Sequence, residues 1–134
     1  TRTDAVNAML DWIADDPTGA SDSDILVIGD LNAYSMEDPM LAFKTAGYVN
    51  LLDEDEDAYS FIFDGQAGAL DHALVSSSLA DQVVAVLEWH INADEPGVLD
   101  YNLDNGRDPK LFDAESPYRS SDHDPIIIGL DLDP

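Results

Sequence analysis

The sequence contains no cysteine and few basic residues. Without cysteine, the chain forms neither a disulfide nor a thiolate metal site. Five lysines and arginines face 29 aspartates and glutamates, which gives a formal net charge of −24 at pH 7. This charge disfavours nucleic-acid binding, because such affinity comes largely from Lys and Arg contacts with phosphates. Either bound divalent cations supply positive charge, or, as we favour, the acidic surface keeps the protein soluble in salty water.

Long apolar runs are also missing from the sequence. No stretch has the length of a membrane span, and no signal peptide is visible, so we expect no membrane partner. The 134 residues, 45% of them hydrophobic, are typical of one globular domain. Because no repeat or linker divides the chain, residues 1–134 are predicted to form a single unit.

Two amphipathic helices are predicted in the first third of the chain. The first covers Asp4–Asp16, with Thr3 as its N-cap, and its apolar face consists of Val6, Met9, Leu10 and Ile13. The second runs from Asp38 to Gly47, with Asp38 as the cap and Pro39 at the first helical position. A short helical turn is expected at Ser77–Gln82.

Apolar or alternating runs predict strands at Asp24–Gly29, Tyr48–Leu52, Ala58–Phe63, Leu70–Ser76, Val83–Ile91 and Pro125–Leu132. The unbroken apolar character of the first strand indicates burial on both faces. A turn at Asp64-Gly65-Gln66 suggests that Ala58–Phe63 and Leu70–Ser76 form a hairpin. The long segment Asn92–Ser120 is predicted to be a loop, and loops of that length are usually functional.

Polar side chains interrupt the apolar strands at a few places. Asp30 and Asn32 follow the first strand, and Asp122 and His123 precede the last one. The oxygen ligands suit Mg²⁺, Mn²⁺ or Ca²⁺ better than zinc, and an imidazole exchanges protons near neutral pH. Asp71 lies within a strand, where a carboxylate is costly unless it is paired, and His123 is its natural partner. This set predicts metal-assisted hydrolysis of a phosphate ester.

These motifs resemble the endonuclease/exonuclease/phosphatase superfamily, which has the DNase I-like fold. The resemblance rests on Gly-Asp-Leu-Asn (29–32), Leu-Asp-His-Ala-Leu-Val-Ser (70–76) and Ser-Ser-Asp-His-Asp-Pro (120–125), which occur in the family's order and rough spacing. Within that superfamily, the stretches 28–34, 59–76, 89–96, 99–102 and 118–125 look like the secreted bacterial extracellular nucleases. The resemblance therefore implies an extracellular hydrolase that cleaves DNA or RNA.

The resemblance also implies a fold and a role for each matched residue. The fold would be α/β (α+β), half of a four-layer α/β sandwich, with one mostly antiparallel sheet and the helices on its outer face. Asp30 would bind or orient the nucleophilic water and the scissile phosphate and would also be a metal ligand, and Asn32 would hold that phosphate. Asp122 would ligate or help position the divalent metal, Mg²⁺ or else Mn²⁺ or Ca²⁺. His123 would act as general base or stabilise the pentacovalent phosphate, and Asp71 would orient it.

The family's first half supplies an Asn, a metal-binding Glu and another catalytic His that have no counterpart in this sequence. Glu37, Glu88, His72 and His90 do not stand in the corresponding contexts. We therefore expect residues 1–134 to be the C-terminal part of the domain, to supply about half of the active site and to be inactive alone. The sheet face that would meet the missing N-terminal half is expected to drive self-association into a homo-oligomer.

Two other functions fit the same residues. One is a phosphoesterase of the same fold that acts on a phospholipid or a sugar phosphate, which the acidic charge mildly favours. The other is a calcium-binding module without catalysis that uses Asp53–Asp57 and the loop Asn92–Ser120. For Asp53–Asp57 itself, a solvated loop is the favoured interpretation.

Several further polar or aromatic residues are assigned structural roles. His72 is expected to be structural or solvent-facing, and Trp89 is expected in the core. His90, Asn92 and Asp94 are expected to brace the loop in preference to binding an ion or lining the edge of the substrate site. Arg119 is expected to pair with one of the many carboxylates.

Overall fold

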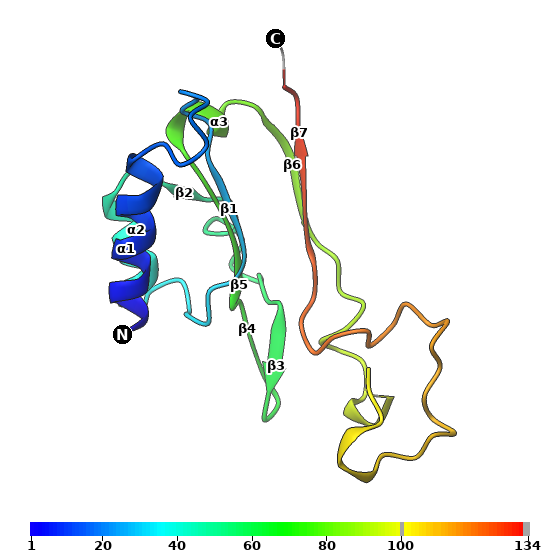
Figure 1. Cartoon of the computed structure of the whole chain (residues 1–134). Helices are drawn as coiled ribbons and strands as arrows, with labels where there is room; N and C mark the ends of the chain where they lie inside the picture. Colours follow the sequence, from blue (N-terminus) through cyan, green and yellow to red (C-terminus); the bar gives the residue numbers. More distant parts are fainter. Residues whose placement is uncertain (100, 133–134) are drawn as a thin grey trace.

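Helices and strands of the chain form stacked layers. The computed structural model describes residues 1–99 and 101–132 as a mixed α+β arrangement with small antiparallel sheets. Helices α1 (Arg2–Ala14) and α2 (Asp38–Thr45) cover one face of a three-stranded sheet, which Figure 1 shows edge-on. The strand order of that sheet is β1 (Leu26–Asp30), β5 (Asp71–Val75) and β2 (Val49–Asn50).

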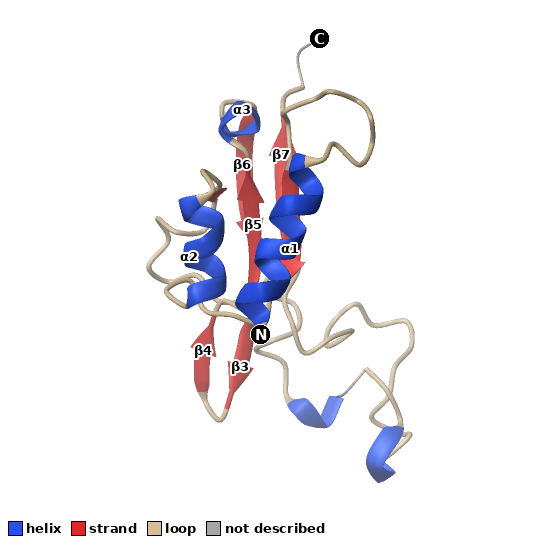
Figure 2. Cartoon of the chain, turned by 60° about the vertical axis from the view of Figure 1, so that its left-hand side comes forward, coloured by secondary structure: helices blue, strands red, loops and turns tan. Residues whose placement is uncertain are grey.

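Two further strand pairs lie beside this sheet. Strands β6 (Val83–Glu88) and β7 (Ile126–Leu130) pair with each other on the side away from the helices (Figure 1). Strands β3 (Phe61–Phe63) and β4 (Gln66–Gly68) form a hairpin, which Figure 2 shows below the sheet. The short helix α3 (Ser77–Ala80) confirms the predicted helical turn. The expected single sheet is therefore divided into three, because neither pair forms a strand ladder with the three-stranded sheet in the described part of the chain.

The predicted pairing of the hairpin was wrong for a reason that lies in its turn. Asp64 and Gly65 both take positive φ angles, 54° and 78°. Two such residues form a type I′ turn, which joins strands through a two-residue loop. Phe63 therefore pairs with Gln66, and Leu70–Ser76 is left to form β5 between β1 and β2.

Helix α1 begins and ends earlier than predicted. Its N-cap is Thr1, and a capping box forms because Thr1 and Asp4 each bond the other's backbone. Asp16 takes a left-handed φ of 49° just before Pro17, so it cannot continue the helix.

In α2, Asp38 is already helical and Glu37 occupies the N-cap position. The Glu37 carboxylate is bound to Arg2 and to the backbone N–H of Tyr34, so it does not cap the helix. The predicted N-caps Thr3 and Asp38 were therefore both wrong, while the helices themselves were confirmed.

The main core lies between the two helices and the three-stranded sheet. It consists of Val6, Ala33, Met40, Phe43 and Leu74, against which the predicted helix residues Met9 and Leu10 pack. Strand β1 was wrongly expected to be buried on both faces, since Leu26 and Ile28 are 37% and 48% exposed. Successive side chains of a strand point to opposite faces, so Val27 packs against the core under the helices while Leu26 and Ile28 lie on the other face. Among the described residues, no helix has both the length and the apolar character needed to cross a bilayer.

His72 on β5 is fully buried. Of the two roles expected for it, the structural one is therefore confirmed and the solvent-facing one is not. Its Nε2 lies 2.7 Å from the carbonyl oxygen of Ala33, and its Nδ1 lies 3.3 Å from Nδ2 of Asn50. Because a carbonyl only accepts and an amide nitrogen only donates, the ring is neutral with its proton on Nε2. Burial lowers the pKa of His72 below its usual 6.5.

This burial predicts a loss of stability in mild acid. The unfolded chain binds a proton at His72 near pH 6.5 and the folded chain does so only at lower pH. The stabilisation is therefore complete above about pH 6.5 and is lost as the pH falls below it. Between about pH 7.5 and pH 5, the free energy of unfolding in urea should drop more in the wild type than in His72→Gln. Equal drops in the two proteins would contradict the neutral, buried ring.

Candidate active site

Three of the predicted site residues are brought together by β1 and β5. Asp30 and Asp71 are direct partners in the antiparallel register of these strands. Asp71 Oδ2 lies 2.6 Å from Nδ1 of His123, which precedes β7. Because a carboxylate only accepts hydrogen bonds, Nδ1 of His123 must carry a proton, and in the neutral ring Nε2 would then hold the lone pair. The structure thus pairs Asp71 with His123 and places Asp30 across from Asp71.

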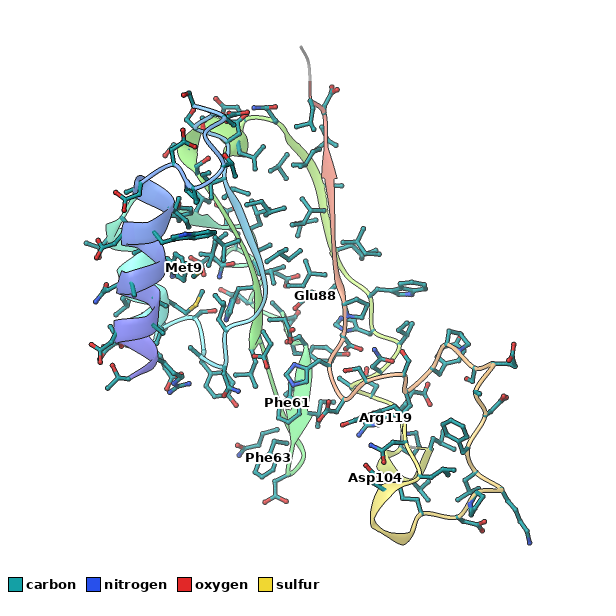
Figure 3. The ribbon with its side chains drawn as sticks, in the orientation of Figure 1. Met9, Phe61, Phe63, Glu88, Asp104 and Arg119 are labelled. Atoms are coloured by element: carbon teal, nitrogen blue, oxygen red, sulfur yellow. The ribbon has the colours of Figure 1, made fainter. Side chains whose placement is uncertain are left out.

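The ring of His123 is held from a second direction. It stacks on Phe61 with a centroid distance of 4.7 Å and an interplanar angle of 28°. The backbones of the same two residues form an isolated antiparallel bridge. Figure 3 shows Phe61 at the end of β3 that lies next to the segment leading into β7. The imidazole is therefore oriented by a carboxylate at its edge and by an aromatic ring at its face.

Asp30 and Asn32 form the turn that ends β1. The backbone N–H of Asn32 donates to Oδ1 of Asp30 at 2.7 Å, and Asn32 takes a left-handed φ of 51°. Among residues other than glycine, Asn tolerates this conformation well. Both side chains are exposed, so solvent or a substrate can reach them.

Asp122, the other predicted metal ligand, is half-buried directly before His123. Over residues 1–99 and 101–132, the structure brings together no group of three or more His, Asp or Glu side chains that could hold a metal ion. The two predicted metal ligands thus stand on the turn after β1 and on the segment before β7.

A residue that sequence reasoning missed, Asp124, organises the surroundings of His123. Its carboxylate is buried, and Oδ1 accepts the backbone N–H groups of Ile91, Asn92 and Ala93 at 3.1, 2.8 and 2.9 Å. Its Oδ2 lies 2.9 Å from Nδ1 of His90. In the sequence, Asp124 is an aspartate that precedes an apolar strand, and the same is true of Asp122. This context therefore does not show which of the two carboxylates is buried.

Ser60 was also missed, although it connects the two halves of the site. This fully buried residue accepts the backbone N–H groups of Leu70 and Asp71 on its Oγ, at 3.1 and 3.0 Å. Its carbonyl oxygen accepts the backbone N–H of Asp124 at 2.8 Å. One serine therefore fixes the backbone next to both partners of the Asp71–His123 pair.

The expected loop-bracing role of His90, Asn92 and Asp94 is confirmed. His90 stacks on Tyr59 with a centroid distance of 4.0 Å and an interplanar angle of 3°. The Tyr59 hydroxyl donates to Asp94 at 2.5 Å, and this bond raises the pKa of Tyr59 to about 12. Asn92 Nδ2 donates to the carbonyl oxygen of His123 at 2.7 Å, and its Oδ1 accepts from the backbone of Ser120.

Two other expectations for this region were wrong. Trp89 is 50% exposed instead of lying in the core, because it follows the end of β6 at Glu88. Its backbone N–H donates to the carbonyl oxygen of Pro125, and its own carbonyl oxygen accepts from Ile91. Arg119 donates to the carbonyl oxygen of Asn92 at 3.0 Å, and none of the ion pairs found among the described residues includes it. The carbonyl lies within reach because the backbone N–H of Arg119 also bonds Ile91.

Glu88 is a second carboxylate near His90, and it lies between β6–β7 and the three-stranded sheet (Figure 3). Its Oε1 is buried without a hydrogen-bond partner, and burial raises its pKa. In the acidic run 53–57, Asp53 pairs with Lys44 at 2.7 Å and accepts from Asn50 at 2.9 Å, so its carboxylate is used within the fold.

The hydrogen bonds of Asp124 predict a large stability difference between neighbouring carboxylates. Asp124→Ala leaves three N–H groups without an acceptor, two of them in buried residues, which should lower the free energy of unfolding by about 3 kcal/mol. The matched control Asp122→Ala should stay within about 0.5 kcal/mol of the wild type. Urea unfolding in metal-free buffer measures both, and similar losses in the two variants would refute the anchoring role of Asp124.

Comparison of the chain with protein-family models, with curated proteins and with solved structures found no match in any of the three. The resemblance drawn from the polar motifs therefore stays a prediction. The geometry around Asp71 and His123 is the observation that bears on function.

Proposed function

We propose that this chain forms part of the active site of a divalent-metal-dependent phosphodiesterase, a nuclease acting on DNA or RNA. The observation that supports the proposal best is the Asp71–His123 pair at 2.6 Å, with Asp30 opposite Asp71 on the neighbouring strand. A carboxylate-oriented imidazole beside an exposed carboxylate is a suitable arrangement for moving a proton during hydrolysis.

Each of the chain's own residues has a chemical task in this proposal. Asp71 keeps the proton on Nδ1 of His123, so the Nε2 lone pair accepts a proton from the attacking water. The carboxylate of Asp30 accepts a hydrogen bond from the same water and orients it. The side-chain amide of Asn32 donates to a phosphate oxygen, where negative charge increases in the transition state.

The donor set fits a hard divalent cation. Asp30 and Asp122 offer carboxylate oxygens, and Mg²⁺ is typically held by one or two carboxylates together with waters and substrate phosphates. The lack of a three-residue ligand cluster among the described residues is compatible with that mode. When bound, Mg²⁺, Mn²⁺ or Ca²⁺ would polarise the phosphoryl oxygen and offset its charge.

We further propose that residues 1–134 are the C-terminal part of a DNase I-like domain of a secreted nuclease. Support comes from the layer order, in which helices α1 and α2, the sheet β1-β5-β2 and the pair β6–β7 follow one another (Figure 1). In a four-layer α/β sandwich, an outer layer of helices covers one sheet, and a second sheet lies on the other side of that sheet. The C-terminal part of such a domain would have this order of layers. The N-terminal half of such a domain would then supply the remaining catalytic groups and complete the layer of β6–β7.

The net charge of −24 favours one alternative, a phosphoesterase of the same fold that acts on a phospholipid or sugar phosphate. The two activities separate in one assay of the natural full-length protein that contains this chain. Hydrolysis of plasmid DNA, of RNA and of a lipid phosphodiester would be measured with Mg²⁺ or Mn²⁺ and again with EDTA. Cleavage of the lipid alone would select the alternative.

In this assay, His123→Ala should lower kcat by at least about 10²-fold, the usual contribution of a general base. Asp71→Asn should also lower kcat, because the amide no longer fixes the tautomer. The matched control His72→Gln changes a neighbouring imidazole and should stay within about twofold of the wild type at neutral pH. Full activity of His123→Ala would refute the proposal.

We also propose that the outer face of β6–β7 is an interface. Leu87 and Ile127 are register partners on this pair and are 55% and 46% exposed. Apolar side chains that adjoin in this way are usually covered, by the other half of a domain or by a second copy of the chain. In a solution of residues 1–134 alone, only a second copy of the chain can cover this face.

Light scattering over a range of concentrations tests this interface on residues 1–134. The wild type should self-associate, and Ile127→Asp should shift the mass toward the monomer. The control Met36→Asp alters a 78% exposed apolar residue outside the sheet and should behave as the wild type. A monomeric wild type at high concentration would count against the interface.

A further inference from the structure

The long loop between β6 and β7 encloses a small pocket that the proposed mechanism does not use. The pocket has a volume of about 180 Å³, below the range of about 300–1,000 Å³ typical of pockets for drug-sized ligands. Its lining includes Leu99, Tyr101, Phe112, Asp113, Tyr118 and Arg119. Figure 3 shows Arg119 where the loop joins the rest of the molecule and Asp104 toward the loop's far end.

The aromatic side chains of this pocket are not packed as a core. Tyr101, Phe112 and Tyr118 are 43%, 38% and 55% exposed, although burying such rings would be favourable. Rings that stay accessible around one small cavity present flat apolar faces to a ligand. A ligand of matching shape is a planar aromatic group, such as the base of a nucleotide.

The charge of the loop differs from that of the rest of the chain. Residues 97–120 contain three of the five basic residues, Arg107, Lys110 and Arg119, but only five of the 29 acidic ones. The guanidinium of Arg119 borders the pocket, and its Nε is buried without a hydrogen-bond partner. A polyanion is therefore repelled less here than elsewhere on the protein.

The pocket is also tied to the candidate active site. Arg119 donates to the carbonyl oxygen of Asn92, and Asn92 donates to the carbonyl oxygen of His123. Arg119 and His123 are four positions apart in the chain, a span of at most roughly 14 Å. A base held in the pocket would thus lie within a few nucleotides of the proposed site of hydrolysis.

We propose that this pocket binds an unpaired base of a single-stranded polynucleotide by stacking. The choice of a polynucleotide rests on the proposed function, whereas the binding of a planar base rests on the pocket itself. A base inside a duplex is stacked and paired, so it cannot enter. The substrate class that this pocket selects is therefore single-stranded DNA or RNA, or an unpaired segment of a duplex.

The salt dependence of binding provides a first test. A fluorescein-labelled oligomer of deoxyadenosine would be titrated with the chain in EDTA, beside an abasic oligomer of equal length and a duplex. At about 1 M salt, long-range repulsion from the acidic protein is screened, while base stacking persists. The affinity for the single strand at about 1 M salt should therefore equal or exceed its affinity at about 0.1 M salt. Binding through phosphate contacts would show the opposite dependence on salt.

Substitutions in the pocket provide a second test. Phe112→Ala and Tyr118→Ala should each weaken binding of the single strand at least about fivefold, the loss of a stack of about 1 kcal/mol. The control Trp12→Ala removes a 61% exposed ring from α1 and should leave binding unchanged. Unfolding curves establish that each variant is folded. Phe112→Leu keeps the bulk of the side chain but not the aromatic ring, so it should also weaken binding of the single strand.

Equal affinity for the base-containing and abasic oligomers would overturn the proposal, as would unchanged binding in both ring variants or no binding of the single strand at all. These outcomes are independent of catalysis, because EDTA is present throughout. Base-dependent binding together with full activity of His123→Ala would retain the pocket and reject the proposed function. Loss of activity in His123→Ala without base-dependent binding would retain the function and reject the pocket.

Discussion

A single buried carboxylate, that of Asp124, holds the candidate site together. Three consecutive backbone N–H groups, those of residues 91–93, converge on one of its oxygens, and His90 binds the other. A buried carboxylate is costly unless its lone pairs are satisfied, so these bonds fix where the chain leaves β6 and where it enters β7. His123, the neighbour of Asp124, is consequently held where Asp71 and Phe61 can reach it.

The sequence predicted those features that depend on local chemistry. Asp71 stands alone in an apolar strand, and a carboxylate there needs a partner such as His123. The helices followed from the spacing of residues such as Val6 and Met9, and both were found with shifted ends. The positions of the six predicted strands were found within a few residues for the same reason, since alternation and apolar runs are local signals. Strand β4 was missed, because Gln66 was assigned to the turn.

The remaining features depend on contacts that the sequence does not display. The separation of β3 from β5 follows from a two-residue turn at Asp64 and Gly65, whose geometry overrides the pairing that hydrophobicity suggested. Asp124 and Asp122 look alike in the sequence, but only Asp124 meets backbone donors from a segment about thirty positions away. Trp89 was expected in the core, yet it follows the end of β6 and lies at the surface.

The central claim is that Asp71 fixes His123 as a neutral base with a free Nε2. Nitrogen-15 NMR of the His123 ring in residues 1–134 at neutral pH tests it most directly, because the two ring nitrogens report which one carries the proton. The account predicts a single tautomer with the proton on Nδ1, and a mixture of tautomers in Asp71→Ala. A proton on Nε2 in the wild type, or a ring whose tautomers are unaffected by removing Asp71, would contradict it.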